Sequence, residues 1–257
     1  RASNLPALQL PDGGQINECT SLAVARADKP VWLAQNWDWV GSQREALVLI
    51  EAHPDEGPAY LTVCEAGMLA KIGLNEHGLG ITLNILRSMD DGSKPGMPVH
   101  LLLRGLLDCA DVEAARKLAL SLNYASSSNV MIADPAGNIA SIELAPAGAK
   151  ILEAENNQLA HTNHFLHADL ADNDASGEDN LSTSARLSMA HQQLDDIDGL
   201  DDINALLSDT SQGEESVCRF PDEALPPAAR VETVVGVAMN LSDRELWVTG
   251  AQPSVSA

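Results

Sequence analysis

The chain has 257 residues, of which 45% are hydrophobic and only 3% are aromatic. It carries 15 Lys and Arg against 37 Asp and Glu, which gives a formal net charge of −22. These values predict a globular chain with an aliphatic core. They argue against nucleic acids and anionic membranes as partners, because both need clusters of basic side chains.

Short apolar or alternating runs, separated by turn residues, fill the first third of the chain and predict a β-rich block. The strands that we expect there are residues 19–26, 31–39, 46–52, 59–65, 69–74 and 79–86. Two segments with helical periodicity follow at 96–109 and 111–123, and Asp111 is the expected N-cap of the second helix.

The second half of the chain begins with a predicted hairpin over 129–144 that turns at Pro135–Asn138. The other elements that we expect are strands near 149–154 and 158–163, a polar acidic loop at 168–183, helices at 184–193 and 201–209, and a second hairpin at 231–250. No internal repeat or biased linker interrupts this series, so we expect one α+β domain over residues 1–257.

The four cysteines, Cys19, Cys64, Cys109 and Cys218, are widely spaced along the chain. Without a Cys-x-x-Cys pair, the sequence predicts neither a disulfide framework nor a zinc site. No apolar run approaches the roughly 18 residues of a membrane span, and no signal-peptide core is visible. We therefore expect no metal and no other cofactor, and a cytoplasmic location is favoured.

Cys19 stands where the polar, turn-forming residues 12–18 enter the first predicted strand. A thiol with an ordinary pKa of about 8.5 needs a base to become a nucleophile at neutral pH. An internal cysteine must use a histidine, whereas a cysteine at an amino terminus has its own α-amine, with a pKa of about 7.7–8, within reach. Cys19 is therefore either a small buried packing residue or a nucleophile at a newly formed amino terminus.

Asp38 and Arg219 are candidate charged residues of such a site. Asp38 lies in the apolar run 31–39, so its carboxylate needs a partner such as an α-ammonium or an arginine. The alternative for Asp38 is a hydrogen-bonded structural role. Arg219 closes an acidic loop, where pairing with neighbouring surface acids is the alternative role.

Two asparagines are candidate amide donors. Asn163 lies between two histidines at the end of a predicted strand, and a rigidly held amide there can donate to a developing oxyanion. Asn84 is a second strand-borne amide, with a weaker signal of its own. The spacing of His161, His164 and His167 matches no zinc motif, which favours core or surface histidines over a metal site.

The order of these motifs is more specific than any one of them. Cys-Thr-Ser from residue 19 is followed by QNWDW at 35–39 and then by EAGMLAKIGLNEHGLGITLN, GMPVHLLLRGLLD, HTNH, STSARL and SVCR. This series covers about residues 17–250. It resembles the acyl-coenzyme A:6-aminopenicillanic acid acyltransferase family of N-terminal nucleophile (Ntn) hydrolases, which are related to penicillin V acylases, bile salt hydrolases and β-alanyl-amine hydrolases.

The resemblance implies a four-layer αββα sandwich. It also implies a precursor that cuts its own Glu18–Cys19 bond by an N-to-S acyl shift, so that residues 1–18 are a remnant of the pre-nucleophile segment and 19–257 the nucleophile-bearing chain. Family precursors usually carry a longer segment before the cysteine, and that segment can shape the substrate pocket. Ser184 and Arg186 fall on a Ser-x-Arg pattern of the family.

The resemblance also implies roles for the candidate residues. By position, Cys19 matches the family nucleophile, Asp38 the aspartate that holds its amine, and Asn163 the asparagine of the oxyanion hole. Arg219 matches the arginine near the nucleophile, and Asn84 a second polar group.

A self-cleaving amidohydrolase or acyltransferase is thus the expected function, acting on a small N-acyl amide through an acyl-Cys19 thioester. An acyl-coenzyme A thioester is a second candidate donor. Two alternatives remain open: an uncut Cys–His hydrolase with His161 or His164 as base, and an inactive relative that binds a small acylated ligand. Acyl and amine specificity, hydrolysis versus transfer, and the oligomeric state are open as well.

Overall fold

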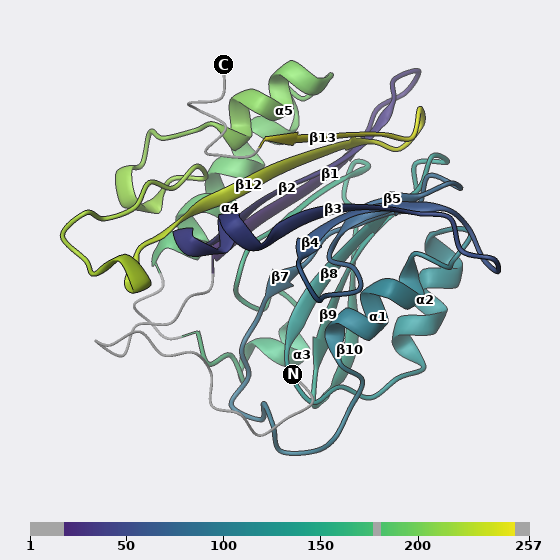
Figure 1. The fold of residues 1–257 in the computed structure, drawn as a ribbon, viewed down its shortest axis with the longest axis horizontal. Coiled ribbons are helices and arrows are strands. Elements are labelled where there is room, and N and C mark those ends of the chain that lie inside the picture. The colour runs from purple at the N-terminus through teal and green to yellow at the C-terminus, as the bar shows by residue number, and fades with distance from the viewer. Residues whose placement is uncertain (1–17, 177–180, 250–257) are drawn as a thin grey trace.

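The computed structural model describes residues 18–176 and 181–249, except for the side chains of residues 18 and 181. The predicted pre-nucleophile segment lies outside the described residues, apart from the main chain of residue 18. The described chain forms two antiparallel sheets that stack face to face, with helices on both outer sides (Figure 1).

The first sheet has the strand order β11-β1-β2-β12-β13. Its strands are β1 (Glu18–Ala25), β2 (Val31–Val40), β11 (Gln158–His161), β12 (Val231–Asn240) and β13 (Glu245–Thr249). The second sheet has the order β10-β9-β8-β6-β5-β4-β3, and β7 pairs with β8 beside this path. Its strands are β3 (Leu47–Ala52), β4 (Tyr60–Glu65), β5 (Ile72–Asn75), β6 (Gly80–Ile81), β7 (Asn84–Ile85), β8 (Ser128–Ala133), β9 (Ile139–Ala145) and β10 (Gly148–Glu153).

Helices cover the outer faces of both sheets. They are α1 (Val99–Leu106), α2 (Val112–Leu120), α3 (Ala168–Ala171), α4 (Leu181–Leu194) and α5 (Leu200–Leu207), and the short 3₁₀ turns are η1 (Gly41–Ala46), η2 (Gly213–Glu215) and η3 (Pro227–Ala229). In Figure 1, α1 and α2 lie against the second sheet, and α4 and α5 lie against the first.

Apolar clusters hold the four layers together. Leu33 and Met131 belong to the cluster between the two sheets. Leu103 of α1 belongs to the cluster under the second sheet, and Ala190 of α4 packs in the same cluster as Leu22 of β1. The order helix–sheet–sheet–helix confirms the αββα sandwich, and each layer is stabilised by apolar area removed from water.

The run 79–86, expected as one strand, forms the two short strands β6 and β7 instead. Gln35 of the first sheet explains the break. Its side chain donates to the Leu83 carbonyl and accepts from Leu83 N at 2.9 Å, so the main chain of Leu83 leaves the ladder. A side chain from the opposite sheet therefore divides the predicted strand.

Helix α1 begins at Val99, three residues later than expected, because the preceding chain is extended. Pro98 has φ −62° and ψ 132°, and Met97 forms a bridge with Tyr124. The N-cap prediction for α2 is confirmed, since the Asp111 side chain accepts from Ala114 N at 2.8 Å.

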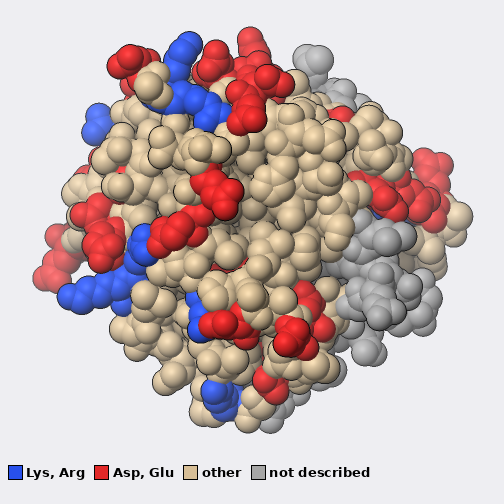
Figure 2. Space-filling view, turned by 180° about the vertical axis from the view of Figure 1, so that it is seen from behind, with Lys and Arg blue, Asp and Glu red and all other residues tan. Residues whose placement is uncertain are grey.

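The acidic segment 168–183, expected as a loop, is only partly one. It contains α3 at its beginning and the first turn of α4 at its end, while residues 177–180 lie outside the described residues. Asp and Glu side chains gather in several separate groups over the surface, as Figure 2 shows for one face. No helix in the described part of the chain is long and apolar enough to span a membrane.

Candidate active site

Cys19 lies in β1 opposite Trp37 of β2, within the cluster between the two sheets. It is only 2% exposed. Burial raises the pKa of the Cys19 thiol to about 12, and the charge of Asp38 acts in the same direction, whereas the charges of Lys71 and Arg186 lower it. In the continuous chain the thiol is therefore protonated at neutral pH and needs a base to react.

The side-chain amide of Asn163 contacts the main chain of Cys19. Asn163 Oδ1 accepts a hydrogen bond of 2.7 Å from Cys19 N and one of 3.1 Å from Arg186 Nη2. Asn163 Nδ2 donates to the Ile85 carbonyl at 2.9 Å. Two donors on one side of the amide and a carbonyl on the other fix its orientation, so the amide is held rigidly.

Arg186 of α4 is a buried cation that contacts both Asn163 and the main chain of Cys19. It donates to the carbonyl of Cys19 and, at 3.0 Å, to Thr20 Oγ1, in addition to its bond with Asn163. Of the Ser-x-Arg pattern, Arg186 thus reaches Cys19, whereas Ser184 is exposed. The positive charge of Arg186 favours the thiolate form of the neighbouring thiol.

Asp38 is fully buried in β2, as its place in an apolar run predicts. Its Oδ1 accepts a hydrogen bond of 2.7 Å from Thr233 Oγ1, which in turn accepts one of 2.9 Å from the main-chain N–H of Arg219. The half-buried guanidinium of Arg219 donates to Ser182 Oγ at 2.8 Å, and Arg186 Nε donates to the same hydroxyl at 3.1 Å. A continuous set of hydrogen bonds therefore runs from Asp38 to Arg186.

Asn84 is the first residue of β7 and contacts β1 at Ser21. Its Oδ1 accepts from Ser21 Oγ at 2.7 Å and from Asn129 Nδ2 at 3.3 Å, and its Nδ2 donates to the His161 carbonyl at 3.3 Å. Within the described residues Asn84 makes no hydrogen bond to Cys19. Through Ser21, which lies two residues after Cys19 in β1, Asn84 links the first sheet to the second beside the proposed nucleophile.

The histidines of the HTNHFLH segment contact three different partners. His161 Nε2 lies 2.9 Å from Glu143 Oε1, His164 contacts a threonine hydroxyl, and His167 caps α3. Among the described residues neither His161 nor His164 hydrogen-bonds to the Cys19 thiol. The same part of the chain contains no group of three His, Cys, Asp or Glu side chains arranged to hold a metal ion.

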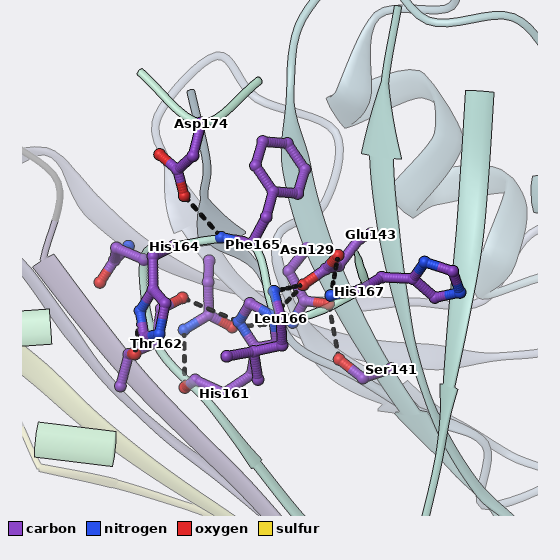
Figure 3. Close-up of polar contacts among 12 residues, drawn as sticks. Asn129, Ser141, Glu143, His161, Thr162, His164, Phe165, Leu166, His167 and Asp174 are labelled. Carbon is purple, nitrogen blue, oxygen red and sulfur yellow. Dashed lines mark hydrogen bonds and ion pairs between the residues drawn. The ribbon is translucent and has the colours of Figure 1, made fainter. Parts of the chain in front are cut away.

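Glu143 of β9 holds both ends of the segment that carries Asn163 (Figure 3). Its Oε1 accepts from His161 Nε2 at 2.9 Å and from Leu166 N at 2.6 Å, and its Oε2 accepts from His167 N at 3.1 Å. The other ring nitrogen of His161 lies 3.0 Å from a main-chain carbonyl. Both ring nitrogens of His161 therefore have an oxygen partner, which fixes the orientation of the ring at one end of the segment.

We expect Glu143→Gln to lower the free energy of unfolding by about 1–3 kcal/mol, because the new amide group faces buried donors with which it makes no bond. Denaturant unfolding of the purified chain measures this change. Glu153→Gln is the matched control, since Glu153 pairs with Arg116 at the surface, where the exchange changes stability by about 0.5 kcal/mol or less. Equal losses in both variants would contradict the clamping role of Glu143.

A buried ion pair near Cys19 was not among the predicted site residues. Lys71 Nζ lies 2.9 Å from Glu65 Oε1 and 3.2 Å from the ring centroid of Trp37, the residue opposite Cys19. The sequence carries a signal for this pair, namely a lysine inside the apolar run 69–74. Such a residue is rarely buried unless it is paired.

Comparison with protein families gives one match over most of the chain. The model for acyl-coenzyme A:6-aminopenicillanic acid acyl-transferase matches residues 24–254. The 40 kDa form of the acyl-coenzyme A:6-aminopenicillanic-acid acyltransferase of Emericella nidulans is 30% identical over 135 residues, which are 51% of this chain and 37% of that protein. The chain thus aligns with little more than a third of that relative's length.

Solved structures share the fold at low sequence identity. The Caenorhabditis elegans ortholog of N-acylethanolamine-hydrolyzing acid amidase has a TM-score of 0.63 and 14% identity, over 90% of this chain and 100% of that chain. Penicillin V acylase from Agrobacterium tumefaciens has a TM-score of 0.60 and 17% identity, over 91% of this chain and 83% of that chain. The predicted Ntn-hydrolase fold is thereby confirmed.

Proposed function

Because this chain belongs to the acyl-coenzyme A:6-aminopenicillanic acid acyl-transferase family, we propose that it is a self-cleaving amidohydrolase or acyltransferase with Cys19 as its nucleophile. The observation that carries the proposal is the hydrogen bond of 2.7 Å between Cys19 N and Asn163 Oδ1. It engages the one nitrogen that a cut before Cys19 converts from an amide into an amine.

The cut begins with attack of Cys19 Sγ on the carbonyl carbon of residue 18. The peptide C–N bond breaks, a thioester forms, and the nitrogen of Cys19 takes up the proton that the thiol gives up. Breaking of the C–N bond has already freed the α-amine of Cys19, and water then hydrolyses the thioester, which releases the carboxylate of residue 18 and restores the Cys19 thiol. The hydrogen bond from Arg186 to the Cys19 carbonyl supports this step by holding the strand in place.

Turnover uses the same sulfur. The α-amine of Cys19 takes the thiol proton, directly or through a water, and the thiolate attacks the carbonyl carbon of an N-acyl amide. Asn163 Nδ2 and a main-chain N–H donate to the oxyanion of the tetrahedral intermediate. The leaving amine departs with the proton and an acyl-Cys19 thioester remains, which water or a second amine resolves.

Asp38 and Arg219 position the catalytic amine in this mechanism. Asp38 orients the α-ammonium of Cys19, since a buried carboxylate favours a neighbouring cation. Arg219 braces Asp38 through the hydroxyl of Thr233, which bonds to both residues. Asn84 supports the adjacent part of β1 through Ser21.

Small N-acyl amides are the proposed substrate class, with an acyl-coenzyme A thioester as a second acyl donor. This class is suggested by the names of the similar proteins, which include an N-acylethanolamine-hydrolyzing amidase and a penicillin V acylase. Because a thiolate is a good leaving group, the acyl-enzyme is open to both hydrolysis and transfer.

Intact mass spectrometry of the purified protein, together with an activity screen, tests the proposal. We expect a fragment that begins at Cys19, and product release from at least one member of a panel of N-acyl amides, β-lactams, homoserine lactones and β-alanyl amines. Activity in a protein that keeps residues 18 and 19 joined would contradict it and favour the uncut Cys–His hydrolase. An inactive, ligand-binding relative would show no turnover, and its Cys19 would react with iodoacetamide no faster than the other thiols.

A further inference from the structure

Lys71 is a lysine held in the protein interior by two specific contacts. Its side chain is only 7% exposed, Nζ donates to Glu65 Oε1 at 2.9 Å, and the same atom lies 3.2 Å from the centroid of the Trp37 ring. The main chain is fixed as well, because Lys71 N donates to Thr62 Oγ1 at 3.1 Å. The face of an aromatic ring attracts a desolvated ammonium, so the ion pair and the ring together define the position of Nζ.

The register of the first sheet brings this ammonium to the proposed nucleophile. Trp37 is directly opposite Cys19 in the antiparallel pair β1–β2, and both side chains belong to the cluster between the sheets. Opposite side chains in such a pair have Cβ atoms about 4.5–5.5 Å apart. Lys71 therefore lies on the ring that flanks the Cys19 thiol, and the two groups interact electrostatically.

Other charged groups surround the two residues. Asp38 and Arg186 act on Cys19, the first disfavouring and the second favouring the thiolate. Glu65, Cys64 and His100 lie around the ammonium of Lys71. Burial lowers the pKa of Lys71, and the Glu65 carboxylate opposes this shift by favouring the charged form.

We propose that Lys71 is a positioning residue of the Cys19 site, whose fixed ammonium stabilises the negative charge that develops on the sulfur. The inference rests on the proposed role of Cys19 as the nucleophile. Lys71 takes up and releases no proton in this scheme, because the thiol proton goes to the α-amine. Its charge favours the thiolate at the moment of attack, and Glu65 and Trp37 prevent the ammonium from turning away.

The alkylation rate of Cys19 by iodoacetamide as a function of pH tests the proposal on the full chain. Only the thiolate reacts, so below the thiol pKa the rate rises about tenfold per pH unit and reports the thiolate fraction. We expect Lys71→Met to lower the rate about tenfold at each pH between about 6 and 9, which displaces the profile to higher pH. Lys71→Arg, which keeps the cation, should stay within about threefold of the wild type.

Two further variants distinguish the effect of the Lys71 charge from a structural effect of the substitution. Lys71→Met combined with Glu65→Gln leaves no unpaired buried carboxylate, and it should react as slowly as the single variant. Lys150→Met removes a lysine from a surface pair with Asp169 and should leave the rate unchanged. Circular dichroism and unfolding curves confirm that each variant is folded, and the double variant provides the test if Lys71→Met alone does not fold.

Several outcomes would overturn the proposal. These are a wild-type rate in Lys71→Met, an Arg variant as slow as the Met variant, a double variant restored to the wild-type rate, or a wild-type Cys19 that does not react at all. The assay needs no substrate and no turnover. A protein without amidase activity would still show the displaced profile, so failure of the proposed function and failure of this inference are distinguishable.

Discussion

Cys19→Ala is expected to abolish both the cut between residues 18 and 19 and the turnover of N-acyl amides. In the proposed mechanism both reactions pass through a thioester on Cys19 Sγ, and alanine has no atom that can form one. Cys19→Ser should keep a weaker nucleophile and show slow cutting and slow turnover. Intact mass measures the cut, and product release from an N-acyl amide measures turnover.

Cys109→Ala is the matched control for this substitution. Cys109 is a half-buried thiol after α1, where its Sγ contacts the Gly105 carbonyl. This variant loses a thiol of similar size outside the site and should cut and turn over like the wild type. Because Cys19 also packs between the sheets, unfolding curves must show that Cys19→Ala is folded. Full amidase activity in that folded variant would exclude Cys19 as the nucleophile.

Local sequence pattern predicts many of the elements but not how they assemble. The apolar runs at 19–26 and 31–39 match β1 and β2 closely, since strands that are buried on both faces appear as continuous apolar segments. The break between β6 and β7 depends instead on Gln35, which is 48 positions from Leu83. The αββα order came from the resemblance to a family, because no local pattern specifies which strands pair.

For the candidate site, too, the sequence identifies individual residues but not the residues that they contact. Local pattern makes Cys19, Asp38 and Asn163 candidates and the order of the motifs adds their expected roles. The contacts, however, join residues 144 positions apart for Cys19 and Asn163, and 195 apart for Asp38 and Thr233. Lys71 has a signal as a lysine inside an apolar run, but its partners Glu65 and Trp37 lie on β4 and β2, and no local pattern identifies them. The roles of the site residues and the single-domain organisation stay predictions.

Asn163→Ala is expected to lower kcat about 100- to 1,000-fold in the cut protein, which is the usual loss when one oxyanion donor is removed. KM should change less, because the oxyanion exists only in the transition state and the intermediate that follows it. Steady-state kinetics with an N-acyl amide, normalised to the amount of cut chain found by mass, gives both values.

Asn163→Asp distinguishes an oxyanion donor from an anchor of the Cys19 main chain. Aspartate keeps an oxygen that accepts from Cys19 N and Arg186, but it lacks the Nδ2 donor. Aspartate also loses the bond from Nδ2 to the Ile85 carbonyl. If Asn163 donates to the oxyanion, the Asp variant should still be as slow as the Ala variant, whereas a pure anchor would leave the Asp variant clearly faster than the Ala variant, because it keeps the acceptor for Cys19 N. Asn36→Ala is the control, since this buried amide donates to the Leu207 and Val217 carbonyls, and its loss should reduce stability with little change in kcat. A wild-type kcat in Asn163→Ala would remove Asn163 from the catalytic site.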